Sequence, residues 1–211
     1  MVRVKICGMT RAEDVDAAIM AGADAVGFIV GFPASPRNMT LNDAAKLARR
    51  VGPFVDAVLV TTIDVIRKDL ARVKALNPDA IQLYGDPVNP DEIRDLLDVR
   101  LIRPYVLKSP GLNEAKREVE GFDAVLTDTY IAGSAGGTGK TSDWAVCAGI
   151  RTAIAPVPLV LSGGLNPQNV EKAVRRVRPF AVDVSSGVEN SPGVKDHHMV
   201  SAFVRMAKMA D

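Results

Sequence analysis

Histidine is scarce in this chain of 211 residues, since only His197 and His198 are present, next to each other near the C-terminus. This scarcity argues against Ser-His-Asp hydrolysis and against a zinc site with several histidine ligands. Any acid–base chemistry must therefore rest on Cys, Asp, Glu, Lys or Tyr side chains.

Cysteine and long apolar runs are also few. The two cysteines, Cys7 and Cys147, fit a reducing cytosol better than a disulfide scaffold. No apolar run approaches the roughly 20 residues that a membrane-spanning helix needs. The N-terminus shows no signal-peptide pattern. We therefore expect a cytoplasmic protein with no membrane partner.

Charge of either sign is not concentrated in the sequence. The formal net charge is +1, Lys and Arg are scattered, and aromatic residues make up only 5%, so nucleic acid is not expected as a partner. Hydrophobic residues at 47% and charged residues at 24% are typical of a soluble globular protein. The length suits one domain over residues 1–211 better than two small ones.

Short apolar runs alternate with segments of helical spacing along the whole chain. The predicted strands are Val2–Ile6, Ala25–Val30, Val55–Val60, Asp79–Leu83, Arg100–Arg103, Ala124–Thr127, and two that begin at Leu159 and Phe180. The predicted helices are Arg11–Met20 with Thr10 as its N-cap, Thr40 to about Val51, Ile63–Leu76, Pro90–Leu97, Gly111–Val119, Ser142–Arg151, one opened by Asn166-Pro167, and one from Asp196 to Lys208.

Eight strand–helix pairs of this kind imply parallel strands with right-handed crossovers. Because all eight pairs fit within one domain of 211 residues, they favour an α/β fold, a single closed (β/α)8 TIM barrel. An open doubly wound sheet is the alternative. Its G-x-G-x-x-G fingerprint is missing after the first strand, where Cys7-Gly8-Met9 stands instead.

The stretch Leu159–Asp196 contains the last two predicted strands, and each ends in a turn of small residues. Both turns lie at the carboxyl ends of parallel strands, where exposed main-chain N–H groups form a cradle for an anion such as phosphate. A phosphate site built from the last two strand-to-helix loops recurs in (β/α)8 barrels. The residues expected to bind this phosphate are Gly163, Gly164, Ser185, Ser186 and Gly187.

Cys7 follows the first predicted strand, at the end of the barrel where active sites lie. If Val4 and Ile6 face the outer helices, strand alternation points Lys5 and Cys7 into the barrel. A free cysteine is often only a small buried hydrophobe, which is our interpretation of Cys147. For Cys7 we expect a reactive thiol, because nearby Lys5 would lower its pKa below the usual value of about 8.5.

The same alternation places Asp183 on the inward face of the eighth predicted strand, together with Ser185. The first and eighth strands are neighbours across the seam of a closed barrel. We therefore predict an ion pair between Lys5 and Asp183, within about 4 Å, in the layer beneath the site.

Asp128 and Arg37 are two further candidates. Asp128 ends the sixth predicted strand, so it reaches the same end of the barrel as Cys7, although capping of a turn or pairing with a loop lysine is an alternative. Arg37 lies in a loop at the mouth end of the second strand. It is either a solvated surface charge or a bidentate partner for a ligand carboxylate.

The glycine-rich run Gly136 to Thr141 resembles a P-loop but fails the motif by one residue, because position 134 is a serine. Its place after the sixth strand is also wrong for a P-loop. We expect a loop that covers a phosphate or the mouth of the active site instead.

Together these residues resemble one family, phosphoribosylanthranilate isomerase, which acts in tryptophan biosynthesis. The resemblance is carried by Val4–Thr10, Gly22–Phe28, Gln82-Leu83, Asp128 with Gly136–Trp144, and most of Leu161–Asp196. It implies a (β/α)8 barrel that uses no cofactor and takes a small-molecule substrate, phosphoribosylanthranilate. The implied reaction is an Amadori rearrangement to 1-(2-carboxyphenylamino)-1-deoxyribulose 5-phosphate.

The resemblance also implies roles for individual residues. Cys7 would be the general base, Asp128 the general acid, and Arg37 the group that binds the anthranilate carboxylate. The substrate phosphate would lie on the turns at Gly163-Gly164 and Ser185-Ser186-Gly187. Monomer and homodimer both stay open as the assembly.

The chain departs from the usual residues of the family at a few positions, and none removes the acid, the base or the carboxylate clamp. Tyr84 stands for His, Ser142 for Phe, Thr61 for Asn and Arg103 for Lys. The alternative functions are a barrel that acts on another sugar phosphate, broadened specificity towards a related aminoaldose, and a non-catalytic phosphate-ligand binder. A binder would need neither Cys7 nor Asp128.

Overall fold

The computed structural model describes residues 1–85, 88–106, 117–128 and 142–210, without the side chains of Val106 and Asp128. Its barrel strands are β1 (Arg3–Ile6), β2 (Ala25–Val30), β4 (Asp56–Thr62), β5 (Ala80–Tyr84), β6 (Arg100–Val106), β7 (Ala124–Asp128), β8 (Leu159–Leu161) and β9 (Ala181–Val184). Each begins at the residue that the sequence predicts or one residue after it.

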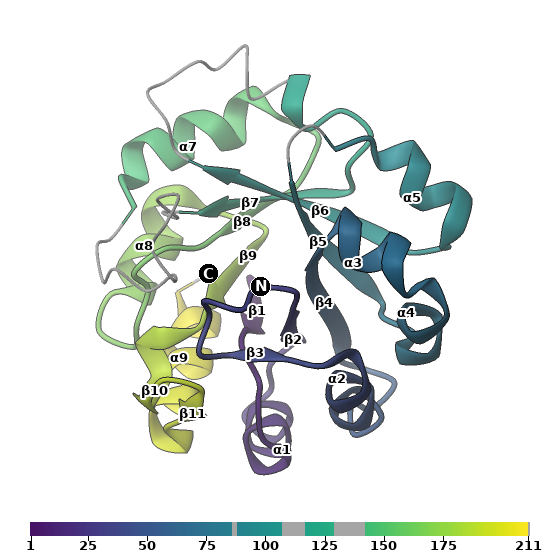
Figure 1. The fold of residues 1–211 in the computed structure, drawn as a ribbon. Coiled ribbons are helices and arrows are strands. Elements are labelled where there is room, and N and C mark those ends of the chain that lie inside the picture. The colour runs from purple at the N-terminus through teal and green to yellow at the C-terminus, as the bar shows by residue number, and fades with distance from the viewer. Residues whose placement is uncertain (86–87, 107–116, 129–141, 211) are drawn as a thin grey trace.

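The barrel strands are all parallel, and they close into a ring. Neighbours follow the order β1-β9-β8-β7-β6-β5-β4-β2, and β2 pairs back onto β1. Lys5 lies opposite Asp183 on one side of β1 and opposite Ala25 on the other. The helices surround this ring of strands (Figure 1). The closure confirms the predicted (β/α)8 barrel and excludes the open doubly wound sheet.

The surrounding helices follow the strands in alternation. They are α1 (Ala12–Met20), α2 (Leu41–Ala48), α3 (Ile63–Lys68), α4 (Leu70–Leu76), α5 (Pro90–Leu96), α7 (Trp144–Ala153), α8 (Val170–Val177) and α9 (His197–Met209). Within the described ranges, none of the helices combines the length and the apolar character needed to cross a membrane. The predicted helix Gly111–Val119 and the glycine-rich run at 136–141 fall mostly or wholly outside the described residues.

The start of α1 differs from the prediction. Arg11, rather than Thr10, occupies its N-cap position, and no side chain caps it. The Thr10 hydroxyl instead donates to the Gly193 carbonyl. Other caps are as predicted: the Thr40 hydroxyl accepts from the Asp43 N–H, and Asp196 caps α9.

The segment predicted as one helix over Ile63–Leu76 is two helices. Asp69 leaves the helical conformation, with φ −148° and ψ 55°, and so ends α3. Its side chain then accepts from the Arg72 N–H and caps α4. Farther along the chain, α8 begins at Val170 rather than at Asn166, because the intervening residues form a turn.

Some short elements beyond the barrel were not predicted. β3 (Asn38–Met39) pairs with the end of β2. After β9, a 3-10 turn η1 (Ser186–Val188) leads into an antiparallel hairpin of β10 (Glu189–Ser191) and β11 (Val194–Lys195). In Figure 1 this hairpin lies beside α9 at the edge of the barrel.

An Asp-Ala pair recurs at the amino ends of three strands, and each aspartate binds the main chain of the preceding strand. The aspartates Asp24, Asp79 and Asp123 each precede an alanine that starts a strand. Their carboxylates accept from the N–H groups of Val4, Ala57 and Leu101 on the preceding barrel strand, at 2.8, 2.8 and 2.7 Å. These carboxylates therefore supply hydrogen-bond acceptors for main-chain N–H groups near the starts of the strands.

The apolar residues divide by strand face. Val4, Ile6 and Phe28 are fully buried in the large core between strands and helices. Leu126, Val160 and Ala181 belong to a separate, smaller cluster. Because alternate residues face opposite sides of a strand, the smaller cluster fills the barrel interior.

The predicted ion pair between Lys5 and Asp183 is confirmed. Lys5 Nζ lies 2.8 Å from Asp183 Oδ1, and both side chains are buried. The same ammonium donates to Gln82 Oε1 at 3.2 Å, and Asp183 Oδ2 accepts from Ser162 Oγ at 3.3 Å. Burial alone opposes the charge of Lys5, but the carboxylate of Asp183 and the nearby Cys7 raise its pKa above the usual value.

We expect Asp183→Leu to lower the free energy of unfolding by about 3–5 kcal/mol, because it leaves Lys5 as an uncompensated buried charge. The double variant Lys5→Met/Asp183→Leu should recover most of this loss, since no isolated charge remains. Urea unfolding of the parent and both variants at neutral pH measures the effect. If Asp183→Leu were as stable as the parent, the ion pair would not be needed for the stability of the fold.

Candidate active site

Cys7 lies one residue beyond β1, at the carboxyl ends of the barrel strands. Its N–H donates to the Val184 carbonyl at the end of β9, at 2.8 Å, and the residue is buried. The neighbouring strand β2 makes room for it at Gly27. A Cβ atom there would lie 2.8 Å from Cys7 Sγ and 3.3 Å from Lys5 Cε. The glycine therefore creates the space in which the thiol and the ammonium sit.

The expectation that the pKa of Cys7 lies below its usual value is wrong, although Lys5 acts in the expected direction. Burial raises the pKa of the Cys7 thiol above its usual value, and the attraction of Lys5 offsets only part of this effect. The negative charge of Asp183, the ion-pair partner of Lys5, also disfavours the thiolate and adds to the effect of burial. Cys147 is buried on α7, and burial raises its pKa to about 11, as expected of a structural cysteine.

Arg37 is buried and forms an ion pair with Glu189. The alternative interpretation of Arg37 as a solvated surface charge is therefore wrong. Its Nε and Nη2 donate to the two carboxylate oxygens of Glu189, at 2.8 and 2.6 Å. The Arg37 side chain is only 8% exposed and that of Glu189 only 4%. The pair is bidentate, and it occupies one edge of the guanidinium.

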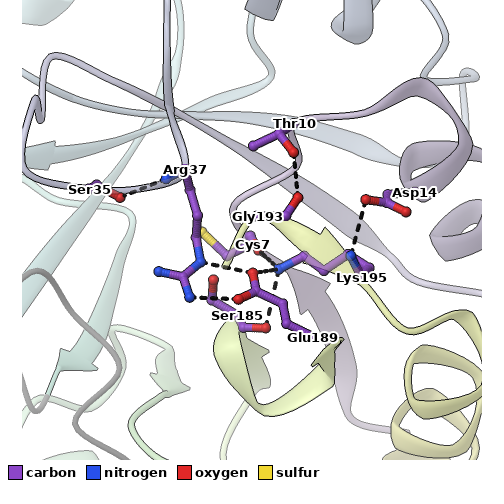
Figure 2. Close-up of polar contacts among 9 residues, drawn as sticks. All are labelled: Cys7, Thr10, Asp14, Ser35, Arg37, Ser185, Glu189, Gly193 and Lys195. Carbon is purple, nitrogen blue, oxygen red and sulfur yellow. Dashed lines mark hydrogen bonds and ion pairs between the residues drawn. The ribbon is translucent and has the colours of Figure 1, made fainter. Parts of the chain in front are cut away.

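Lys195, on β11, completes this cluster. Its ammonium donates to the Cys7 carbonyl at 2.6 Å, the Ser185 carbonyl at 3.2 Å and Glu189 Oε1 at 2.8 Å. Figure 2 shows Glu189 between the side chains of Arg37 and Lys195. Two cations thus share one carboxylate beside Cys7.

The sequence analysis missed both Glu189 and Lys195. A signal for them was present, because Ser191-Pro192-Gly193 is a turn sequence, and Gly193 adopts a φ of +83°. A hairpin at this position returns the chain toward the end of β9. Charged residues on its strands were therefore candidates for the same end of the barrel.

The two loops expected to bind phosphate lie next to each other. Gly163 and Gly164 follow β8 with φ values of +96° and +66°, and Ser185 to Gly187 follow β9. The two loops pack so closely that a Cβ atom on Gly187 would lie 1.9 Å from the Leu165 carbonyl oxygen. Ser185 Oγ is buried and has no hydrogen-bond partner among the described residues.

Hydrogen bonds hold the first of these loops in place. Ser142 Oγ donates to the Ser162 carbonyl at 2.7 Å, and Ser142 N–H donates to the Gly163 carbonyl at 3.4 Å. Asn169 Nδ2 donates to the Gly164 carbonyl at 2.9 Å. The carbonyl oxygens of the two glycines are therefore engaged within the protein. Ser142, one of the departures expected from the sequence, anchors the loop through polar contacts.

Asp128 is the last residue of β7, where it lies in register with Val106 on β6. This backbone position is at the carboxyl end of the barrel, as the sequence predicts. Its side chain, and the glycine-rich run that follows at 136–141, lie outside the described part of the chain.

Tyr84, another of the departures expected from the sequence, stands at the end of β5. Gln82 Nε2 donates to its hydroxyl at 3.1 Å, so Tyr84 continues the polar chain that starts at Asp183 and Lys5. Its ring packs edge-on against Phe32, with 5.3 Å between the ring centroids. A polar side chain therefore still reaches this end of the barrel.

Comparison with known proteins gives a consistent result over the whole chain. The family model for N-(5'phosphoribosyl)anthranilate (PRA) isomerase matches residues 4–206. A protein of Haloarcula marismortui named N-(5'-phosphoribosyl)anthranilate isomerase is 42% identical over 215 residues, which cover 100% of this chain and 98% of that protein.

Two solved structures have the same fold. A phosphoribosyl anthranilate isomerase in complex with reduced 1-(o-carboxyphenylamino)-1-deoxyribulose 5-phosphate is 37% identical, with a TM-score of 0.82 over 99% of this chain and 100% of that one. A structure of monomers generated from the dimeric isomerase of Thermotoga maritima is 36% identical, with a TM-score of 0.81 over 99% and 100% of the two chains.

We expect Gly187→Ala to lower the free energy of unfolding by about 1–3 kcal/mol, because the added methyl group forces the two loops apart. Gly52→Ala is the matched control, since an added Cβ there meets nothing within 4 Å. Urea unfolding of both variants measures the difference. Equal midpoints would show that the loops have room for a side chain.

Proposed function

The chain belongs to the N-(5'-phosphoribosyl)anthranilate isomerase family, and we propose that Cys7 and Asp128 are the base and the acid of its reaction. The protein is an isomerase of tryptophan biosynthesis that converts N-(5-phosphoribosyl)anthranilate to 1-(2-carboxyphenylamino)-1-deoxyribulose 5-phosphate. The family match over residues 4–206 carries this conclusion. The positions of Cys7 after β1 and Asp128 at the end of β7 support the two roles.

The rearrangement needs one proton donor and one proton acceptor. The acid protonates the furanose ring oxygen, and the ring opens to a Schiff base of the anthranilate nitrogen. The base then removes the proton from C2 of the sugar, which gives an enolamine that tautomerises to the ketone. A carboxylic acid and a thiolate are sufficient for these steps.

Cys7 suits the base because its thiol faces charged groups inside the barrel. The Lys5 and Lys195 ammonium groups both favour the thiolate, while burial disfavours it. A thiolate of raised pKa is a stronger base than an ordinary one, which helps it to accept a proton from carbon. The carboxyl of Asp128 must be protonated to act as the acid, which requires a raised pKa in the substrate complex.

Arg37 suits the carboxylate of the anthranilate group. Glu189 binds the edge of the guanidinium formed by Nε and Nη2, so the edge with Nη1 remains for a second bidentate carboxylate. The cluster of Arg37, Lys195 and Glu189 also carries two positive charges against one negative charge. A ligand carboxylate would balance this excess.

The loops after β8 and β9 suit the phosphate at the other end of the substrate. Left-handed glycines and a short 3-10 turn present main-chain N–H groups at this end of the barrel. Ser185 Oγ, which has no partner in the described part of the chain, adds a hydroxyl donor. Gly163, Gly164, Ser185, Ser186 and Gly187 are therefore our proposed phosphate ligands.

The oligomeric state and the cellular compartment of the enzyme are inferred from two observations. The related Thermotoga maritima isomerase is described as dimeric, and we propose a monomer or a homodimer for this chain, acting as one domain. Its two unpaired buried cysteines agree with a reducing compartment, and we place the enzyme in the cytoplasm.

Turnover by catalytic variants tests the proposed roles. With phosphoribosylanthranilate generated in situ, loss of its anthranilate fluorescence should slow about 10²- to 10⁴-fold in Cys7→Ser and in Asp128→Asn. Both variants should still bind a reduced product analogue with nearly the parent affinity, because Arg37 and the phosphate loops are intact. Undiminished turnover in both variants would refute the assignment, and no turnover by the parent would indicate another substrate or a binder.

The pH dependence of kcat/KM tests the base separately. Because the active enzyme needs Cys7 as the thiolate and Asp128 protonated, kcat/KM should follow a bell-shaped pH curve bounded by the two pKa values. Burial raises the pKa of Cys7, so the limb that Cys7 sets should lie above about 8.5. In Cys7→Asp this limb should move to lower pH, since a carboxylate loses its proton earlier. A limb that stays in place in Cys7→Asp would exclude Cys7 as the base.

A further inference from the structure

We propose that Lys195 and Glu189 are positioning residues of the isomerase, in that Lys195 fixes the main chain of Cys7 and Glu189 fixes the edge of Arg37 that faces the substrate. The inference rests on the proposed roles of Cys7 and Arg37. Both residues belong to the β10–β11 hairpin, which is not part of the (β/α)8 framework.

Lys195 is placed to hold two strand ends together. Its three N–H groups have three acceptors, which are the carbonyls of Cys7 and Ser185 and the carboxylate of Glu189. Burial lowers the pKa of Lys195, and the carboxylate of Glu189 opposes this effect. The three acceptors suit the charged ammonium, which is the form with three N–H groups. The Lys195 side chain is 0% exposed. The ammonium therefore ties the residue that carries the thiol to the first residue of the loop proposed to bind phosphate.

Glu189 is placed to orient Arg37. Its Oε1 accepts from both Arg37 Nε and Lys195 Nζ, and its Oε2 accepts from Arg37 Nη2. A bidentate pair fixes the plane of a guanidinium as well as its position. Without Glu189, Arg37 would retain its charge but lose the contact that selects which edge it presents.

The hairpin that carries these two residues is anchored from the other side. The Thr10 hydroxyl donates to the Gly193 carbonyl at the hairpin turn. The buried Asp14 on α1 accepts from the Lys195 N–H at 3.1 Å and contacts His197 Nε2 at 2.8 Å. Figure 2 shows the contacts of Thr10 with Gly193 and of Asp14 with Lys195, and Asp14 lies on the side of Lys195 away from Arg37. The hairpin is thus a fixed support and not a free surface loop.

The charges around Cys7 allow an experiment to distinguish the role of Lys195 from that of Glu189. The charged groups that interact with Cys7 from the elements packed around it are Lys5 on β1, Asp183 on β9, Lys195 on β11 and Arg37 before β3. Glu189 on β10 pairs with two of them, Arg37 and Lys195. Removing the Lys195 cation disfavours the thiolate, whereas removing the Glu189 anion favours it. The two substitutions should therefore shift the pKa of Cys7 in opposite directions, which general damage to the fold would not do.

The experiment uses the full chain in a Cys147→Ala background, so that Cys7 is the only thiol. The variants are Lys195→Met and Glu189→Gln, with Lys46→Met and Glu171→Gln as matched controls on exposed helix surfaces. Two readouts are measured: the pH midpoint of Cys7 alkylation by iodoacetamide in the free protein, and kcat and KM for phosphoribosylanthranilate.

Lys195→Met should raise the alkylation midpoint and lower kcat about tenfold or more, since it loses a charged hydrogen bond to the main chain of Cys7. Glu189→Gln should lower the midpoint and raise KM about tenfold or more, because Arg37 loses a bidentate partner. Glu189→Asp keeps the charge but shortens the side chain, so it should raise KM with little change in the midpoint. The controls should match the parent.

The proposal is overturned if both midpoints move in the same direction, or if the variants match the controls in kcat and KM. If Lys195→Met does not fold, Lys195→Arg provides the test for this position, because it keeps the charge and changes the geometry. It should lower kcat with an unchanged midpoint, and parent-like kcat would refute the role. Failure of the proposed function is seen separately, since Cys7→Ser would then retain turnover.

Discussion

The ion pair between Lys5 and Asp183 is the interaction on which the interior of this barrel depends. It joins the first and last strands of the ring, at a distance of 2.8 Å and between two buried side chains. A buried charge is tolerated only when it is paired and hydrogen-bonded. Gln82 on β5 and Ser162, one residue beyond β8, supply those further hydrogen bonds, so the pair connects three strands and the end of a fourth directly beneath the site.

This polar layer separates two kinds of environment. Below it, Leu126, Val160 and Ala181 fill the barrel with apolar side chains. Above it, the strand ends carry groups that suit an anionic substrate: the cluster of Arg37, Glu189 and Lys195 on one side and the glycine loops on the other. A substrate with a carboxylate at one end and a phosphate at the other matches this arrangement. The proposed base, Cys7, lies beside the cluster, because its carbonyl accepts from Lys195.

The environment of Cys7 shows how burial and charge compete at such a site. Lys5 alone would favour the thiolate, but it already neutralises Asp183. Burial therefore prevails, and the pKa of the thiol rises. The second cation near the thiol, Lys195, comes from the hairpin at the far end of the chain. The electrostatics of the proposed base thus depend on residues separated by most of the sequence.

The sequence by itself determined the barrel, the strand starts, the Lys5–Asp183 pair, and the places of Cys7, Asp128 and the two glycine turns. These follow from periodicity and from strand alternation, which are local properties of the chain. Only the tertiary structure decided that Glu189 engages Arg37, that Lys195 reaches the carbonyl of Cys7, and that the pKa of Cys7 is raised. Each of these depends on desolvation and on distances between residues far apart in the chain, which no local pattern records.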